Sequence, residues 1–338
     1  AQQMASGYVF EDNNKNGRKD RREAGIPGVA VSNGIEVTVT NDKGHYSLPA
    51  GTDNTIFVIK PSGYVIPVDE HFIPRYYYHH KPEGSPGSFR YKGVPPTGEL
   101  PGSINFALYK YDEPNNFTTV VFGDPQPYSI QDLDYFSQKI VADVQKTGKT
   151  LFGISLGDIV GDNLDLQPVY KERMKRLQLP WYNVMGNHDM NYDATSDILS
   201  DETFQQNFGL ANLAFNYGDA HFVILDNILY PDPRGGKGYW AGYREDQLRF
   251  LENNLKRVPK NKLIVLSQHI QMKDNTGRSY RLEDRQRIFD LLKDFENVLI
   301  MSAHTHLQDQ IEYTEIDGWQ GKKPLHEYNV GTTSGDWY

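Results

Sequence analysis

Short runs of β-branched and aromatic residues fill much of the first third of the chain. They lie at 7–10, 29–32, 35–39, 46–48, 56–59 and 104–108. Turn residues such as Asn33-Gly34 separate several of them, and short strands with turns between them are typical of a small β-sandwich. Residues 61–102 are rich in Pro, Gly, Tyr and His without a hydrophobic period. We expect a long loop there, before the closing strand at 104–108.

The pattern changes after residues 112–116 to apolar runs that alternate with amphipathic stretches. The predicted strands are 118–122, 151–156, 181–184, 221–225, 263–267 and 298–301, and the predicted helices are 130–146, 166–177, 244–257 and 282–293. Strands that alternate with helices indicate a layered α/β domain. The sequence therefore predicts an all-β sandwich-like domain over residues 5–112, followed by a layered α/β domain over 117–338.

Composition narrows the classes of function. The formal net charge of −9 argues against general nucleic-acid binding, which needs a basic face. With no cysteine in the 338 residues, thiolate ligands and cysteine nucleophiles are excluded. Mean hydropathy is −0.63, and we find no apolar run of the roughly 18 residues that a membrane helix needs. These features predict a soluble protein.

A loop near the start of the chain has the spacing of an EF-hand calcium loop. Oxygen-bearing or carbonyl-supplying residues stand at loop positions 1, 3, 5, 7, 9 and 12, with Gly17 at position 6; they are Asp12, Asn14, Asn16, Arg18, Asp20 and Glu23. A solvated polar hairpin is the alternative. With its flanking strands, the segment resembles the calcium-binding B-type repeats of bacterial surface adhesins. That resemblance implies a stiffening Ca²⁺ and a location outside the cytoplasm.

Five short polar motifs stand at or just beyond the predicted strand ends of the second domain. They are Gly123-Asp-Pro-Gln126, Gly157-Asp-Ile-Val-Gly-Asp162, Gly186-Asn-His-Asp189, Gln268-His269 and Ala303-His-Thr-His306. Open α/β sheets place their chemistry at the carboxyl ends of strands. Carboxylate, amide and imidazole groups together are the ligands that a pair of divalent cations requires. The motifs thus predict a two-metal hydrolytic site.

The order and content of these motifs resemble the calcineurin-like metallophosphoesterase superfamily over residues 117–338. The resemblance implies two metal ions bridged by Asp158. The first ion would be held by Asp124, Gln126, Asp158 and His306. The second would be held by Asp158, Asn187, His269 and His304. The implied ions are Mn²⁺, Mg²⁺, Zn²⁺ or Fe, and Gln126, where the family usually has His, favours the harder Mn²⁺ or Mg²⁺.

The same resemblance implies the chemistry. A metal-bridging hydroxide would attack a phosphate mono- or diester, while His188 stabilises the transition state or protonates the leaving oxygen. We expect Asp189 to orient the His188 ring. Asp162 is a candidate partner for the metal-binding imidazoles, with an ordinary loop role as the alternative. Weaker candidates for substrate contacts are Tyr239, Trp240 and Trp337.

The domain order also resembles a secreted bacterial subfamily that continues into another small β domain. We therefore expect a periplasmic or secreted protein whose signal peptide was removed, and a chain cut short before a C-terminal domain. The expected substrate is a phosphorylated small molecule or a phospholipid-type molecule. The sequence does not determine the oligomeric state.

Two other functions stay open at this stage. The chain could be a catalytically weak surface or periplasmic binding protein built on a phosphoesterase fold. It could also be a serine esterase, because Gly153-Ile-Ser155-Leu-Gly157 matches a nucleophile-elbow string; however, Ser155 is predicted inside a strand rather than on a turn. The aromatic run 76–80 could overhang the site, but we favour an anchor that fixes the long loop to the second domain.

Overall fold

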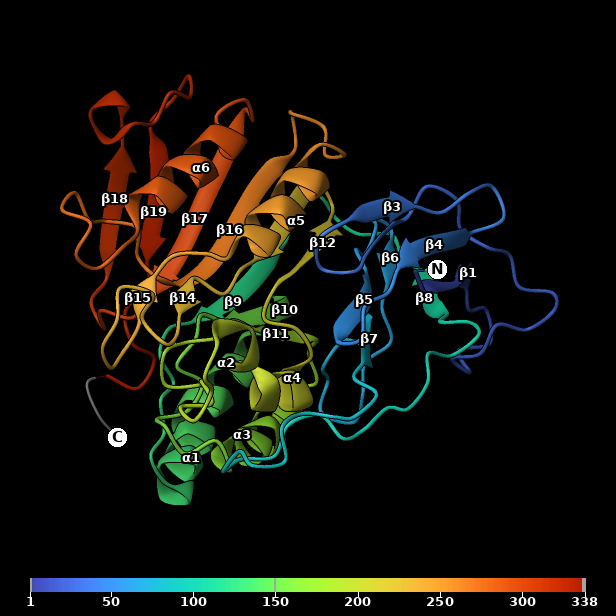
Figure 1. Ribbon diagram of the computed structural model, residues 1–338, viewed down its shortest axis with the longest axis horizontal. Helices are drawn as coiled ribbons and strands as arrows, with labels where there is room; N and C mark the ends of the chain where they lie inside the picture. The colour runs from blue at the N-terminus through green and yellow to red at the C-terminus, as the bar shows by residue number, and fades with distance from the viewer. Residues whose placement is uncertain (1, 149, 336–338) are drawn as a thin grey trace.

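The computed structural model describes residues 2–148 and 150–335, and its N-terminal part consists of two four-stranded sheets (Figure 1). One sheet has the order β4-β1-β8-β6 and the other the order β3-β2-β5-β7. The strands are β1 Met4–Glu11, β2 Ala30–Ser32, β3 Val37–Val39, β4 His45–Pro49, β5 Asn54–Val58, β6 Tyr64–Val65, β7 Tyr77–His80 and β8 Phe106–Lys110. Buried aliphatic and aromatic side chains fill the space between the sheets. The predicted sandwich-like domain is confirmed.

The region expected to be one long loop contains two short strands that the sequence pattern did not reveal. β7 pairs antiparallel with β5 at a sheet edge, and β6 pairs with β8. A two- or four-residue edge strand has too little alternation to be recognised among prolines and glycines. The anchor role of the aromatic run is confirmed: the Tyr76 hydroxyl accepts a hydrogen bond from the Leu210 amide (3.1 Å), and His79 Nε2 lies 3.2 Å from the Gln205 carbonyl oxygen.

The second part is a layered α/β unit with two main sheets. Three parallel strands form the sheet β11-β10-β9, and a mixed sheet has the order β12-β13-β16-β17-β19-β18. The bounds are β9 Thr118–Phe122, β10 Thr150–Ser155, β11 Trp181–Asn183, β12 Leu213–Tyr217, β13 Ala220–Ile224, β14 Ile228–Leu229, β15 Trp240–Ala241, β16 Leu263–Ile270, β17 Asn297–Ala303, β18 Asp309–Tyr313 and β19 Leu325–Asn329. The predicted α/β fold class is confirmed.

Helices cover both sheets. The α-helices are α1 Ile130–Phe136, α2 Ala142–Thr147, α3 Leu166–Met174, α4 Glu202–Phe208, α5 Glu245–Leu255 and α6 Leu282–Leu292. Helices α5 and α6 lie over the six-stranded sheet, whereas α1, α3 and α4 gather beside the three-stranded one (Figure 1). In α5, Leu248, Leu251 and Leu255 are buried at helical spacing, which directs that face to the sheet.

Several short elements carry too weak a sequence pattern to be predicted. Strands β12, β18 and β19 and helix α4 were not predicted, and each carries polar residues among its apolar positions. In β18 and β19, outward-facing polar side chains alternate with buried ones, which is a weak signal over five residues.

Buried ion pairs fasten the two parts together. Lys60 Nζ lies 2.6 Å from Glu113 Oε2 and also donates to the Asn216 carbonyl of the second part (2.7 Å). Lys81 Nζ lies 3.0 Å from Glu202 Oε2 at the start of α4, and both side chains are almost fully buried. Breaking a buried pair leaves an unpaired charge, so these contacts hold the parts in one relative position. No helix within the described ranges is long and apolar enough to cross a membrane.

His221, near the start of β13, is a buried histidine held in its neutral form. Its Nδ1 lies 2.8 Å from Asn216 Oδ1, and its Nε2 lies 2.9 Å from Asn254 Nδ2. A neutral ring with its proton on Nδ1 satisfies both contacts, because it donates to one amide and accepts from the other. Burial lowers the pKa of His221 to about 4.

This pKa predicts a pH-dependent contribution to stability. In the unfolded chain the His221 ring takes up a proton below its ordinary pKa of about 6.5, whereas in the folded chain it stays neutral until the pH approaches 4. The contribution of neutral His221 to the free energy of unfolding is therefore complete above about pH 6.5 and is lost as the pH falls towards 4. We expect His221→Gln to lower the slope of unfolding free energy against pH by up to about 1.4 kcal/mol per pH unit in that window. Urea unfolding measures this slope. Identical slopes in the two proteins would contradict the prediction, and above pH 7 the slopes should agree.

Candidate metal centre

The five predicted motifs meet at one edge of the α/β unit, where parallel strands end. Asp124 and Gln126 follow β9, Asp158 follows β10, Asn187 follows β11 by four residues, His269 lies near the end of β16, and His304 and His306 follow β17. An isolated bridge between Gly123 and Thr332 ties the end of β9 to the segment after β19. The edges of the two sheets therefore converge on the same point.

The backbone adopts unusual conformations at this point. Asp124, Gln126, Asp158, His304 and His306 all have positive φ angles, between 40° and 73°. Left-handed backbone in non-glycine residues costs free energy and persists where the surrounding structure enforces it, most often at functional sites. Here it turns five side chains inward from the strand ends.

Two motif glycines permit close packing around Asp158. A Cβ atom on Gly186 would stand 2.0 Å from the Asp158 amide nitrogen and 2.2 Å from its Oδ1. Gly157 has a φ of 93°, and a Cβ there would stand 2.5 Å from His269 Nδ1. These positions require glycine because no side chain fits between the loops.

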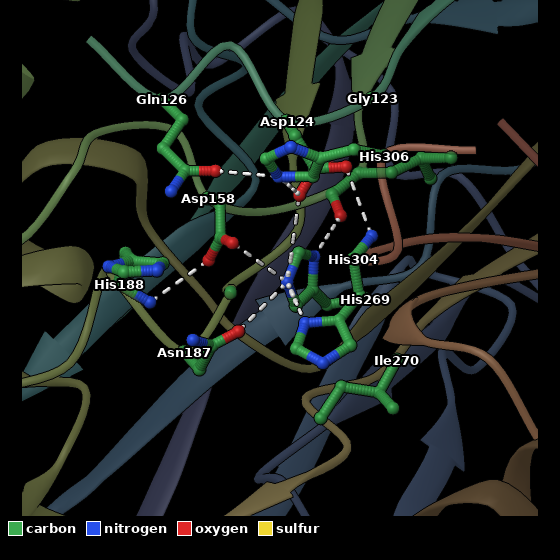
Figure 2. A network of polar contacts seen from close by, with 12 residues as sticks. Gly123, Asp124, Gln126, Asp158, Asn187, His188, His269, Ile270, His304 and His306 are labelled. Atoms are coloured by element: carbon green, nitrogen blue, oxygen red, sulfur yellow. Dashed lines mark hydrogen bonds and ion pairs between the residues drawn. The ribbon is translucent and has the colours of Figure 1, made fainter. Parts of the chain in front are cut away.

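One group of candidate ligands centres on His269, which is fully buried (Figure 2). Its Nε2 lies 3.1 Å from Asp158 Oδ2, 3.1 Å from Asn187 Oδ1 and 3.2 Å from His304 Nδ1. The other ring nitrogen, Nδ1, lies 2.7 Å from the Leu156 carbonyl oxygen, to which it can donate. That contact leaves Nε2 with a lone pair directed at its neighbours, as in metal-binding histidines.

A second group lies on the other side of Asp158. His306 Nε2 is 3.0 Å from Gln126 Oε1 and 3.7 Å from Asp124 Oδ1. Gln126 Nε2 donates to the Tyr128 hydroxyl (2.9 Å), which keeps the amide oxygen turned towards His306. Asp124, Asp158 and His306 form one compact group, while Asp158, His269 and His304 form another, each within 4.8 Å. Asp158 belongs to both.

The charges and lone pairs of this centre fit divalent cations. Burial, together with the negative charge of Asp158, raises the pKa of Asp124, and Asp124 Oδ1 is buried without a hydrogen-bond partner in the described structure. Burial opposes a charged His269 ring, yet the neighbouring carboxylates raise its pKa to about 10. Burial and then the charge of His269 lower the pKa of His304 to about 4. The residues thus require positive charge at their centre, as metal ligands do.

His188 stands beside this centre, but its ring partner differs from the one that we expected. His188 Nδ1 lies 2.6 Å from Asp162 Oδ1, and Asp162 also accepts from the Tyr192 hydroxyl (3.0 Å). The expectation that Asp189 orients this ring is wrong. Asp189 is fully buried and accepts hydrogen bonds from the amides of Ile159, Val160 and Gly186 instead. It holds the loop after β10 against the loop after β11.

A cavity of about 1010 Å³ opens above His188 and Asn187. Tyr239 lines it, as we expected, and its ring centroid lies 6.3 Å from that of His304. Trp240 does not line it: adjacent residues in extended chain point to opposite sides, and its ring packs under the Arg234 guanidinium at 4.3 Å. Trp337 lies outside the described residues.

Several residues of this cavity were not predicted, among them three tyrosines and an arginine. Tyr128 and Tyr192 each follow a recognised motif by two or three residues, so their proximity was a usable signal. Arg90 and Tyr91 come from the first part of the chain, more than 90 residues before His188. They gave no signal because only the tertiary structure brings their loop to the cavity.

Comparisons with known families identify the fold that carries this centre. The family model described as calcineurin-like phosphoesterase matches residues 117–308, which is more than half of the chain. The chain belongs to the calcineurin-like phosphoesterase family. A second model, described as the N terminal of calcineurin-like phosphoesterase, matches residues 13–94.

Individual proteins share little sequence identity with the chain. A probable glycerophosphodiester phosphodiesterase GpdQ of Arcobacter nitrofigilis is 25% identical over 179 residues, covering 52% of this chain and 63% of that protein. The serine-aspartate repeat-containing protein D of Staphylococcus aureus is 25% identical over 321 residues, covering 92% of this chain and 22% of that protein. The chain thus spans less than two thirds of either relative. A crystal structure of a dimetal phosphatase from Danio rerio is 14% identical with a TM-score of 0.45, covering 66% of this chain and 89% of that one.

The role of the converging residues as metal ligands stays a prediction, and counting bound ions tests it. With Ca²⁺ saturating, we expect metal-stripped protein to take up two Mn²⁺ per chain, and Asp158→Asn to take up one or none because Asp158 belongs to both groups. Isothermal titration with elemental analysis gives the stoichiometry. Asp165→Asn, which changes an exposed carboxylate seven residues away, should keep both ions. Two ions retained by Asp158→Asn would contradict the shared role.

Proposed function

We propose that this chain is a metal-dependent phosphoric ester hydrolase that cleaves phosphodiesters. The observation that carries the proposal is the pair of ligand groups that share Asp158, with His188 alongside them. Family membership supports the same class of reaction. The Arcobacter relative is named a probable glycerophosphodiester phosphodiesterase, and a cavity of about 1010 Å³ can hold the two groups that a diester carries, so we favour a diester over a monoester.

Metal ions bound by these residues would supply an activated water and would neutralise charge on the phosphoryl oxygens. The chain's own residues hold His188 in position, and His188 protonates the leaving oxygen. His188 is partly exposed at the cavity floor, and its amide donates to Asp158 Oδ1 at 2.9 Å, which fixes its position beside the ligands. A ring in this position can donate a proton to the leaving oxygen.

The surroundings of His188 favour its protonated form. Burial lowers the affinity of the ring for a proton, but the carboxylates of Asp158 and Asp162 outweigh burial and raise the pKa of His188 above its ordinary value. The 2.6 Å contact of Asp162 with Nδ1 leaves Nε2 available to donate. We therefore propose that His188 is the acid and that Asp162 orients it.

The serine esterase alternative has no support in the geometry. Ser155 is the last residue of β10 and is fully buried. Its hydroxyl lies 2.7 Å from the Tyr170 hydroxyl and accepts a hydrogen bond from Trp181 Nε1 (2.9 Å). A hydroxyl enclosed in this way has no access to a substrate, so a serine-directed inhibitor should have no effect.

Hydrolysis of bis(4-nitrophenyl) phosphate and 4-nitrophenyl phosphate by metal-stripped protein, with and without Mn²⁺, tests the proposal. We expect turnover only with Mn²⁺, and faster turnover of the diester. His188→Ala should lower kcat by about 10²- to 10⁴-fold for a diester with an alkoxide leaving group, because it removes the acid, and by less for the nitrophenyl esters, whose leaving group needs little protonation. Asp162→Asn should lower it by about 10- to 100-fold because the ring loses its orienting partner.

The alternatives predict different results. If hydrolysis continues in the presence of a chelator but stops with a serine-directed inhibitor, the proposed metal-dependent reaction is wrong. Binding of two ions without turnover of either ester, together with unchanged ligand binding in His188→Ala, would favour a binding protein. Asp165→Asn serves as the control and should match the wild-type rate.

We also propose that residues 12–23 bind Ca²⁺, which fits a protein that works outside the cytoplasm. Support comes from the loop spacing and from two of its acids, Asp12 and Glu23, which are buried. Asp12 Oδ2 accepts from the Gly17 amide (2.7 Å), and Glu23 accepts from the amides of Asn13 and Asp20 (2.9 Å each). The compact acid and imidazole groups found among the described residues lie elsewhere, so the spacing carries this proposal.

Thermal unfolding of Mn²⁺-loaded protein tests the calcium site. We expect Ca²⁺ at about 100 times its dissociation constant to stabilise the folded chain by about 2.7 kcal/mol relative to EGTA, raising Tm. Glu23→Gln should abolish this increase because it removes the twelfth-position carboxylate. Asp42→Asn, at an exposed turn, should retain it. An unchanged Tm with and without Ca²⁺ in the wild-type protein would refute the site.

A further inference from the structure

A loop from the N-terminal part, residues 85–94, reaches the cavity of the metal centre. We call it the arginine loop. In Figure 1 the cyan chain that follows β7 runs below α4 and α3 before it returns. The ends of the loop are joined, because the Ser85 amide donates to the Val94 carbonyl and the Val94 amide donates to Ser85 Oγ, each at 2.8 Å.

The arginine loop is fastened to the second part at several points. Ser85 Oγ donates to Glu202 Oε2 (2.7 Å), and Glu202 is the buried partner of Lys81. Farther along, Thr203 Oγ1 donates to the Tyr91 carbonyl (3.2 Å), and the Arg90 amide donates to Asp193 Oδ2 (2.7 Å). The loop is therefore held in place before any substrate arrives, which lowers the entropic cost of binding.

Arg90 and Tyr91 line the same cavity as His188 and Asn187. At about 1010 Å³, the cavity is at the upper end of the range for small-molecule sites, about 300–1,000 Å³, so it has room for much more than one phosphate. Three further tyrosines border it; they are Tyr128, Tyr192 and Tyr239. Aromatic walls of this kind accept a base or a sugar by stacking.

The guanidinium of Arg90 is available to an anion. It is exposed and lies 5.1 Å from the centroid of the Tyr91 ring, and no carboxylate in the described ranges forms an ion pair with it. The two acids of the cavity wall have other partners: Asp162 contacts His188, and Asp193 accepts from the Arg90 backbone. Among the described residues that line the cavity, Arg90 is the only arginine or lysine.

We propose that Arg90 binds a second phosphate of the substrate, which makes the preferred substrate an ester of a nucleoside diphosphate. This inference rests on the proposed phosphodiesterase function and specifies its substrate class. The scissile phosphate belongs at the metal ligands, so a cation on a wall supplied by another part of the chain serves a different anion. Guanidinium groups bind phosphate oxygens through paired, charge-assisted hydrogen bonds.

Two nucleotide esters that differ by one phosphate test this assignment. They are the 4-nitrophenyl esters of thymidine 5′-monophosphate and of thymidine 5′-diphosphate, offered to Mn²⁺-loaded protein. In each, water attacks the phosphorus that carries the aryl group, the bond from that phosphorus to the aryl oxygen breaks, and 4-nitrophenol and the free nucleotide are released. Chromatography of the nucleotide products confirms which bond is cleaved.

We expect the wild-type protein to prefer the diphosphate ester by about tenfold or more in kcat/KM. Arg90→Gln should reduce that preference to about one by raising KM for the diphosphate ester, while kcat for the monophosphate ester stays within about twofold. Arg90→Lys should retain part of the preference, because lysine keeps the positive charge but cannot form the paired hydrogen bonds of a guanidinium group. Lys92→Gln removes an exposed cation two residues away and should leave the preference unchanged.

The possible failures are distinguishable. If wild-type protein hydrolyses both esters equally well, or if Arg90→Gln slows both by the same factor, the assignment of Arg90 is overturned while the phosphodiesterase function stands. If the wild-type protein with Mn²⁺ hydrolyses neither these esters nor bis(4-nitrophenyl) phosphate, the proposed function is overturned and the assignment of Arg90 with it.

Discussion

The structure depends on a concentration of negative charge and lone pairs around Asp158. Carboxylates buried beside imidazoles whose lone pairs point at one another are unfavourable unless a cation lies between them. The raised pKa of His269 expresses the same demand for positive charge, since the neighbouring carboxylates cause it. Left-handed backbone at five of the converging residues is a second cost that the surrounding fold sustains.

The α/β architecture holds these unfavourable groups together, because it places one loop after each of several parallel strands. Strand ends from two sheets converge, so side chains far apart in sequence reach one point without long flexible connections. Asp189 then locks two of the loops through three backbone amides, and Gly186 allows them to touch. The N-terminal sandwich is fastened alongside by buried lysine pairs, and this fixed position lets its loop form part of the cavity wall.

Much of this could be predicted from the sequence because motifs and strand periodicity are local. Both fold classes and the convergence of Asp124, Asp158 and His269 follow from residues near strand ends. The partner of His188 could not be predicted, since Asp189 is its neighbour in sequence and Asp162 lies 26 residues away, yet the loop conformation turns the ring towards Asp162. Arg90 was also hidden, because its loop has no periodicity and its contact spans 103 residues. The short edge strands could not be predicted because so few residues show no clear alternation of apolar and polar positions.

The most direct test of the two-metal centre is a crystal structure of the Mn²⁺-loaded protein, with anomalous scattering used to locate the ions. We expect two Mn²⁺ peaks about 3.5–4 Å apart, both within bonding distance of the Asp158 carboxylate. One ion should also contact Asp124 and His306, and the other His269 and His304. A single ion, or two ions that do not share Asp158, would contradict a two-metal centre bridged by Asp158.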